Sequence, residues 1–151
     1  QTIINPELKL SVMLVKNLVL KANGIYTEVL ENANDAVQLP QLFVNSQLMY
    51  SNIWFGGNFD FQVGVEAHWK SSYYAYGYDP AIQQFYQQKE IKAPDFPVID
   101  IFLNAKVLRG RIFLRYHNVF KAFSDSGPVP TPNYPGVRNV IDFGFDWSFY
   151  D

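Results

Sequence analysis

Charged and histidine side chains that could do chemistry recur at alternate positions along this sequence. We expect these side chains to line one polar surface together: Asp60, Glu66, His68, Lys70, Asp100, Lys106, Arg111, Arg115, His117, Lys121, Asp142 and Asp146. Rows of acids and bases on neighbouring strands can set up a transverse electric field that selects solutes by charge. The same groups, paired across a narrow space, would close that space and add stability instead. The sequence leaves both interpretations open.

These residue types form no recognisable catalytic or metal-binding motif. The two histidines lie on different segments, and the chain has no cysteine that could act as a further ligand. Alternating acids are typical of the polar face of a strand, so we expect no pair of catalytic carboxylates. The sequence lacks a Gly-x-Ser-x-Gly motif, a phosphate-binding loop and a calcium loop. We therefore predict a protein that is not an enzyme and that holds no metal or cofactor.

The elements that must position these side chains have a period of two. From Phe59 to Lys70 apolar residues occupy every odd position, and polar or small residues occupy every even position. Successive side chains of a strand point to opposite faces, so this segment predicts a strand with one apolar and one polar face. At roughly 3.3 Å per residue it extends about 40 Å. Tilted by about 45°, it spans roughly 28 Å, close to the hydrocarbon thickness of a bilayer.

Six other segments show the same alternation less regularly, with exceptions such as Phe102 and Asn118. They are 8–15, 18–30, 42–54, 98–107, 111–122 and 138–151. The connections are alternately short (16–17, 55–58 and 109–110) and long (31–41, 75–97 and 123–137). Short turns on one side and long loops on the other are typical of outer-membrane barrels. The long connections hold eight of the nine prolines, so we expect no strands inside them.

Aromatic residues make up 17% of the 151 residues, and we predict that they form girdles at two membrane interfaces. The short-turn girdle comprises Trp54, Phe55, Phe59, Trp147, Phe149 and Tyr150. The long-loop girdle comprises Trp69, Tyr73, Tyr74, Tyr76 and Tyr78. The alternative is that these aromatics are simply good strand formers.

Composition excludes several classes of protein. A net charge of −2 argues against a nucleic-acid partner. Hydrophobic residues reach 48% and charged residues 17%, so the chain is not a disordered tail. No run of 18 apolar residues exists, which excludes a spanning helix.

Whether the number of strands is odd or even predicts on which side of the membrane each end of the chain lies. The last strand follows a long connection and ends on the short-turn side, so seven strands put residues 1–7 on the long-loop side. Lipid cannot satisfy two unpaired sheet edges, and bacterial barrels have even strand numbers of at least eight. We therefore expect residues 1–151 to be the C-terminal segment of one larger barrel domain. Its apolar faces would point outward, because a midplane Lys or Arg facing lipid costs about 2–4 kcal/mol.

The end of the chain resembles a known family. Residues 140–151 look like the closing strand of an outer-membrane barrel. They resemble the putative porins of Bacteroidetes, whose last strand reads Phe-Gly-hydrophobic-x-Trp-x-Phe-hydrophobic-Asp. The segments 39–40, 73–81, 84–86 and 133–135 also look like that family, so the resemblance covers 18–151. Asp151 departs from the terminal Phe of other bacterial barrels. The resemblance implies a C-terminal assembly strand with outward residues Ile141, Phe143, Phe145, Trp147 and Phe149.

The resemblance implies an all-β, antiparallel, up-and-down transmembrane barrel in a bacterial outer membrane. Its long loops would be extracellular and its C-terminus periplasmic. The implied partners are the lipid bilayer, the barrel-assembly machinery and, through the long loops, other outer-membrane proteins.

Three functions stay open. The first is porin-like passive diffusion of small solutes through a charged lumen. The second is a non-conducting barrel that serves as a structural or accessory subunit of a larger outer-membrane complex. The third is a soluble β-barrel that binds a ligand and points its apolar faces inward. Detergent dependence separates the third from the others, and ion flow separates the first two.

Overall fold

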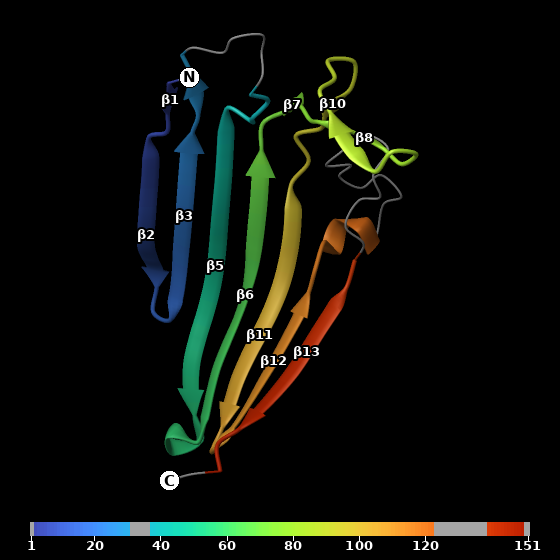
Figure 1. Cartoon of the computed structure of the whole chain (residues 1–151). Coiled ribbons are helices and arrows are strands. Elements are labelled where there is room, and N and C mark those ends of the chain that lie inside the picture. Colours follow the sequence, from blue (N-terminus) through green and yellow to red (C-terminus); the bar gives the residue numbers. More distant parts are fainter. Residues whose placement is uncertain (1, 31–36, 123–138, 150–151) are drawn as a thin grey trace.

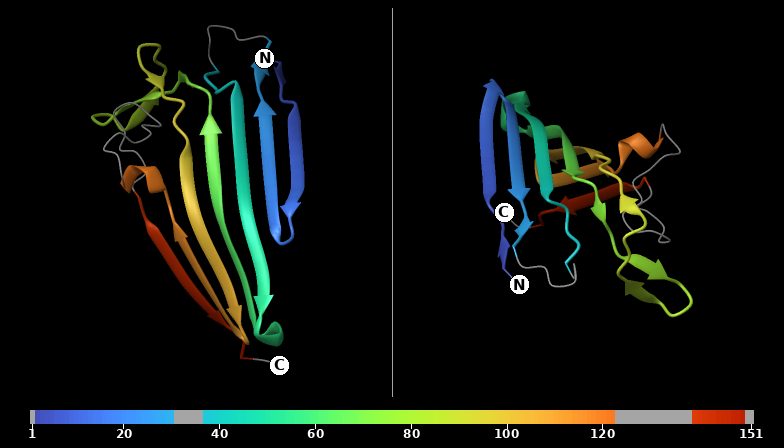
Figure 2. Two further views of the ribbon diagram at one scale, coloured as in Figure 1. Left: turned by 180° about the vertical axis from the view of Figure 1, so that it is seen from behind. Right: turned by 90° about the horizontal axis from the view of Figure 1, so that it is seen from above.

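Seven long strands form one antiparallel sheet in the computed structural model, which describes residues 2–30, 37–122 and 139–149 (Figure 1). The strands are β2 (Glu7–Val15), β3 (Leu18–Tyr26), β5 (Leu42–Trp54), β6 (Phe59–Lys70), β11 (Val98–Val107), β12 (Gly110–Tyr116) and β13 (Ile141–Trp147). Their order in the sheet is β13-β12-β11-β6-β5-β3-β2. Each strand therefore pairs with the long strand before or after it in the chain, which confirms the predicted antiparallel, up-and-down order. Among the described residues the sheet is open, twisted and bent, with β2 and β13 at its edges (Figure 2).

The three short turns lie at one end of the sheet, as predicted. Each contains a non-glycine residue in the left-handed region: Asn17 (φ 69°), Phe55 (φ 54°) and Leu108 (φ 55°). Phe55 begins the short 3-10 helix η2 (Phe55–Gly57), in which both glycines also have positive φ. This conformation costs an L-residue roughly 1–2 kcal/mol, and a tight reversal between two long strands requires it. β13 runs toward this same end, and β2 starts from the opposite end (Figure 1).

The predicted strand over 111–122 is too long. β12 ends at Tyr116, and the chain turns at Asn118, whose φ is 52°. The buried Asp100 carboxylate accepts a hydrogen bond from the Asn118 amide at 3.0 Å, and the 3-10 helix η3 (Val119–Ala122) follows. Lys121 therefore lies in η3 and not on a strand face, because this local capping of the turn outweighs the alternation of the sequence.

Two other predicted segments end early. β3 stops at Tyr26, and the short strand β4 (Glu28–Val29) pairs instead with β1 (Ile3–Ile4), close to the start of the chain. β13 stops at Trp147, so Phe149 lies beyond the last strand. Tyr150 is outside the described residues.

The expectation that the long connections contain no strands is wrong for 75–97. β7 (Tyr73–Tyr74) pairs with β10 (Lys92–Ala93), and β8 (Gly77–Asp79) pairs with β9 (Gln84–Tyr86). Pro80 follows β8, and Pro94 and Pro97 follow β10, so these prolines lie between strands and interrupt none of them. The side chain of Gln88 ties the segment together, because it donates to the carbonyls of Ala75 and Ile91 and accepts from two backbone amides. Residues 123–137 and most of the 31–41 connection lie outside the described part of the chain.

The two faces of the sheet differ in character. One face carries Val63, Leu103, Leu114 and Phe143, which are 38%, 37%, 40% and 69% exposed. They lie in register on neighbouring strands and form a contiguous apolar band. Monomeric soluble proteins rarely expose a large continuous apolar surface. In the described residues the buried hydrophobic side chains are few: Phe61, Ala75, Ala93 and Phe102. The apolar face of the sheet is therefore built to be covered by something outside this chain's described residues.

Candidate functional site

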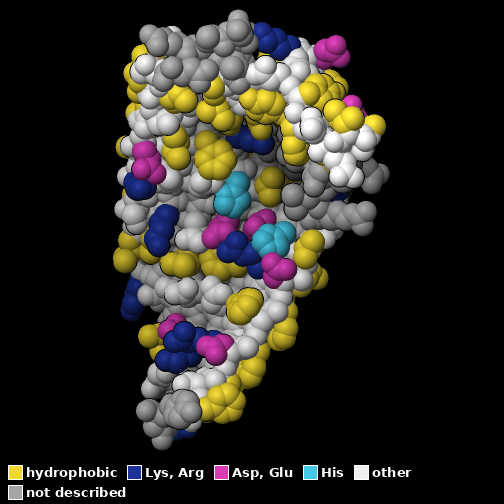
Figure 3. All heavy atoms as spheres, viewed as in Figure 1, with side chains coloured by type: hydrophobic (Ala, Val, Ile, Leu, Met, Phe, Trp, Pro, Cys, Tyr) yellow, Lys and Arg dark blue, Asp and Glu magenta, His cyan; other side chains and the backbone are white. Residues whose placement is uncertain are grey.

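The opposite face of the sheet gathers most of the predicted charged set, as Figure 3 shows. We define the central cluster as Glu66, Asp100, Arg115, His117 and Asp142, and the turn-side row as Asp60, Lys106, Arg111 and Asp146. In the turn-side row each member lies directly opposite the next across β6, β11, β12 and β13. Strand pairing therefore places acids and bases in an acid-base-base-acid order nearest the short turns.

Together with Gln47, the central cluster forms a continuous network of hydrogen bonds and ion pairs across five strands. Arg115 Nη1 lies 2.9 Å from Glu66 Oε2 and 3.8 Å from Asp100 Oδ2. Gln47 on β5 donates to Glu66 Oε1 at 2.6 Å. Asp100 is only 4% exposed, so these neighbouring groups take the place of water around its carboxylate. Because Glu66 lies on β6 and Arg115 on β12, their ion pair reaches across β11.

His117 closes the network from a position just past the end of β12. Its Nδ1 lies 2.8 Å from Asp100 Oδ2, and its Nε2 lies 2.8 Å from Asp142 Oδ2. The hydrogen bond with Asp142 raises the pKa of His117, burial lowers it and Asp100 raises it again, so that the pKa lies above its ordinary value. The imidazole thus favours the charged form, which two carboxylates flank.

Two aromatic rings on this polar face lie over cross-strand glycines. Phe102, an exception to the sequence pattern, lies opposite Gly64, where an added Cβ would be 2.6 Å from the ring. Phe113 covers Gly144 in the same way. The Arg115 guanidinium lies 5.7 Å from the centre of the Phe102 ring. The ring therefore forms the floor beneath Arg115, which it can only do because residue 64 has no side chain.

This packing predicts that Gly64→Ala destabilises the sheet by about 1–3 kcal/mol, the usual cost of overpacking. The new methyl group would lie 2.6 Å from the Leu48 carbonyl oxygen as well as from Phe102, and the backbone cannot rotate away. Gly24→Ala is the matched control, since nothing lies within 4 Å of its Cβ position. Urea unfolding in detergent micelles, followed by circular dichroism, measures both variants. Equal stabilities would contradict the proposed close packing.

The remaining predicted side chains belong to neither the central cluster nor the turn-side row. His68 on β6 pairs with Asn45, with 2.6 Å between Nδ1 and Oδ1. Lys70 lies at the loop end, with its Nζ 5.0 Å from the centre of the Tyr73 ring. Lys121 belongs to η3, as described above.

The predicted short-turn aromatics lie together at the turn end. Trp54 and Phe59 both contact Phe61, at ring-centre distances of 4.6 Å and 5.4 Å. Phe61 was missing from the predicted girdle, although its odd position two residues after Phe59 is a signal for it. Phe145 and Trp147 of β13 also contact each other, at 5.9 Å. At the loop end Trp69 ends the apolar side of β6, whereas the tyrosines belong to the loop segment: Tyr73 and Tyr74 in β7, Tyr76 between β7 and β8, and Tyr78 in β8.

Sequence reasoning missed the polar side chains of β2 and β3. Lys9 Nζ lies 3.0 Å from Glu7 Oε2, and Asn23 donates to Glu7 Oε1 at 3.0 Å. These strands border a hollow of about 530 Å³ that reaches across β5 to β6, lined among others by Lys9, Lys21, Asn23, Asn45, Gln47, Glu66 and His68. The signal was the alternation of leucine and valine at positions 8, 10, 12 and 14 with polar residues at 7, 9 and 11.

The loop segment forms a second hollow, of about 410 Å³, at the opposite end from the short turns. It is lined by polar and aromatic side chains that include Gln38, Gln41, Tyr73, Tyr74 and Lys92. Lys92 Nζ lies 5.0 Å from the centre of the Tyr74 ring. Cationic and aromatic groups are therefore available together at the loop end of the sheet.

Long strands in up-and-down order, a charged face and an opposite exposed apolar face define the class of porin-like outer-membrane proteins. The family model described as "Putative porin" matches residues 2–151, and the chain therefore belongs to the putative porin family. Neither the curated proteins nor the solved structures give a match. Within the described part of the chain, no helix combines the length and apolar character needed to cross a membrane. Membership implies an outer-membrane transport protein and not an enzyme.

Proposed function

We propose that this sheet is one wall of a closed transmembrane barrel through which small solutes diffuse passively. The observation that carries this proposal is the separation of the two faces. Charged groups line one face, and the exposed apolar band covers the other. β5 and β6 have 13 and 12 residues, and strands of this length span roughly 28–30 Å when tilted by about 45°.

The apolar band faces lipid in this proposal, and the charged face lines the lumen. The opposite orientation would place Lys106, Arg111 and Arg115 in hydrocarbon, where each costs about 2–4 kcal/mol at the midplane. The ion pair of Glu66 and Arg115 joins strands of the same wall. This pair does not need to cross the lumen. The geometry therefore favours charges that line an open lumen over charges that pair across it and close it.

Additional strands pair with β2 and β13 in the complete barrel. In the described residues each of these edges has a single neighbour, and an unpaired edge facing lipid leaves backbone groups without hydrogen bonds. We propose that residues 1–151 belong to one barrel domain, with the long loops extracellular and the short turns periplasmic. The lipid bilayer and the barrel-assembly machinery are its proposed partners, and the loop segment offers a surface for other outer-membrane proteins.

Single-channel recording of the native, full-length protein in a planar bilayer tests the proposal. Discrete conductance steps are expected. If protein that is shown to be folded and inserted gives no conductance steps, this result would contradict diffusion and favour a non-conducting accessory subunit. Purification as a stable monomer without detergent would contradict the barrel itself and favour a soluble ligand-binding protein.

The outward residues of β13 are proposed to act in barrel assembly: Ile141, Phe143, Phe145 and Trp147, followed by Phe149 beyond the strand. Phe143 is 69% exposed on the apolar face, so Phe143→Asp places a charge against lipid. We expect much less folded protein in the outer membrane, measured by fractionation and quantitative immunoblotting. Phe143→Leu keeps the apolar surface and is the control. Equal amounts of the Asp and Leu variants would contradict a lipid-facing position.

A further inference from the structure

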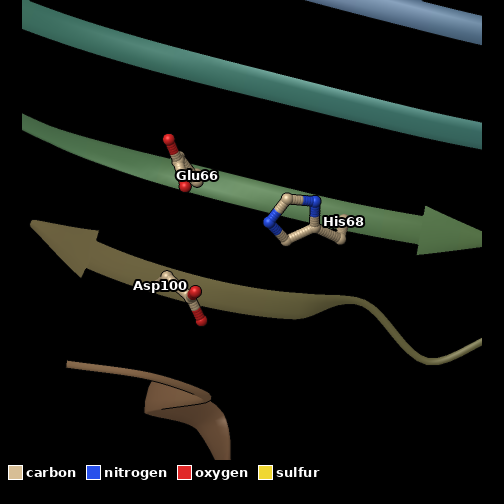
Figure 4. Close-up of side chains that lie close together, drawn as sticks. All are labelled: Glu66, His68 and Asp100. Carbon is tan, nitrogen blue, oxygen red and sulfur yellow. The ribbon is translucent and has the colours of Figure 1, made fainter. Parts of the chain in front are cut away.

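Three potential metal ligands converge beside the central cluster. Glu66 and His68 lie two residues apart on the same face of β6, and Asp100 is directly opposite Glu66 on β11. One ligand atom from each residue lies within 4.8 Å of the other two. Figure 4 shows the three side chains gathered over the space between β6 and β11.

The orientation of His68 suits a metal ligand. Its Nδ1 lies 2.6 Å from Asn45 Oδ1, and an amide oxygen can only accept a hydrogen bond. Nδ1 therefore donates in this hydrogen bond, which leaves Nε2 as the nitrogen that can face a metal ion. Among the described residues no hydrogen-bond partner is found for Nε2. A fixed acceptor behind the coordinating imidazole is the usual outer-shell arrangement of metal-binding histidines.

The carboxylates are held from behind in a similar way. Gln47 donates to Glu66 Oε1, and the Asn118 amide donates to Asp100 Oδ1. The other oxygens, Glu66 Oε2 and Asp100 Oδ2, lie 2.9 Å and 3.8 Å from Arg115 Nη1. Asp100 Oδ2 also lies 2.8 Å from His117 Nδ1, so a metal ion would have to displace this contact as well. The side chain of Arg115 is 36% exposed, so it can move into the adjoining space. Arg115 thus occupies the position where a cation would bind.

We propose that His68, Glu66 and Asp100 bind one divalent transition-metal ion, with Arg115 as the competing internal cation. One imidazole and two carboxylates suit Zn²⁺ or Cu²⁺ better than Mg²⁺ or Ca²⁺, which prefer oxygen ligands alone. Zinc binds such ligands at about 2.0–2.2 Å, so the side chains must close by roughly an ångström. The hollow of about 530 Å³ that Glu66 and His68 help to line gives the ion access.

Calorimetric titration of untagged, folded, full-length protein in detergent with ZnCl₂ tests the proposal. One Zn²⁺ per chain is expected, with MgCl₂ giving no binding. His68→Ala is expected to weaken binding at least tenfold. Arg115→Gln is expected to tighten it, because the competing cation is gone, whereas Arg111→Gln in the turn-side row leaves it unchanged. No zinc binding, unchanged binding by His68→Ala or weaker binding by Arg115→Gln would each overturn the proposal.

A spectroscopic measurement on the unmodified protein guards against variants that fail to fold. Electron paramagnetic resonance of one bound Cu²⁺ is expected to show coupling to a single imidazole nitrogen, and its absence would overturn the proposal. Neither experiment depends on ion flow. Metal binding without conductance would refute only the proposed diffusion. Conductance without metal binding would refute only the proposed metal site.

Discussion

Replacing Asp100 with Leu is expected to lower the free energy of unfolding by about 3–5 kcal/mol, the usual cost of removing one partner of a buried ion pair. Asp100 is 4% exposed and joins three groups: Arg115, His117 and the Asn118 amide. Leucine branches in a similar way but is larger and accepts no hydrogen bond, so all three partners lose their acceptor at once. The turn after β12 would also lose the carboxylate that holds it.

Two variants separate the charge of Asp100 from its hydrogen bonds. Asp100→Asn keeps an acceptor for the Asn118 amide, so we expect about half of the loss or less. Asp146→Asn, at the far end of the turn-side row, is the matched control and changes stability by less than about 1 kcal/mol, as exposed charges do. Guanidinium unfolding in detergent micelles measures the series. A Leu variant as stable as the control would show that the network contributes nothing to folding.

Reversing the two bases of the turn-side row is expected to change the ion selectivity of the channel strongly. Lys106→Glu with Arg111→Glu converts an acid-base-base-acid row into four acids and lowers the net charge at one level of the proposed lumen by four units. Rings of acidic side chains favour cations. We therefore expect the ratio of K⁺ to Cl⁻ permeability to rise several-fold, as read from the reversal potential in a KCl gradient.

The size of that change depends on salt, which gives an internal check. Screening shortens the reach of these charges to about 3 Å at 1 M salt, from about 10 Å at 0.1 M, so the shift is expected to shrink at high salt. Lys16→Glu, in the short turn between β2 and β3, shows the effect of reversing one charge outside the row. The double variant Lys106→Gln, Arg111→Gln removes both positive charges of the row without adding acids that would repel Asp60 and Asp146. Unchanged selectivity in folded channels would place the row away from the ion path.

The main sheet was predictable because its residues obey a strict rule of alternation. Residues 59–70 alternate without a break, and β6 has these bounds in the structure. The turn-side row then follows, because two-residue turns fix how β11 pairs with β12 and so bring Lys106 opposite Arg111. Local sequence therefore determines this part of the site.

The rest of the site depends on contacts that alternation cannot reveal. His117 reaches Asp100 and Asp142 from beyond the end of β12, where positive φ at Asn118 turns the chain. Phe102 breaks the polar pattern because Gly64, on another strand, leaves room for its ring. The loop hairpins were missed because prolines that lie between strands look the same in sequence as prolines that prevent them. The first two misses involve residues that are far apart in the chain, whereas the hairpin β8–β9 is local.

The ion pair that reaches across β11 has a consequence for how the wall is assembled. Glu66 and Arg115 can meet only when β6, β11 and β12 are all in their native alignment. A slip of one residue turns every side chain of a strand to the opposite face, which would carry Arg111 and Arg115 into hydrocarbon together. Misaligned strands would therefore lose the ion pair of Glu66 and Arg115 and would also bury both arginine side chains in hydrocarbon. In the proposed barrel, the network would therefore favour the native register while the strands insert and pair.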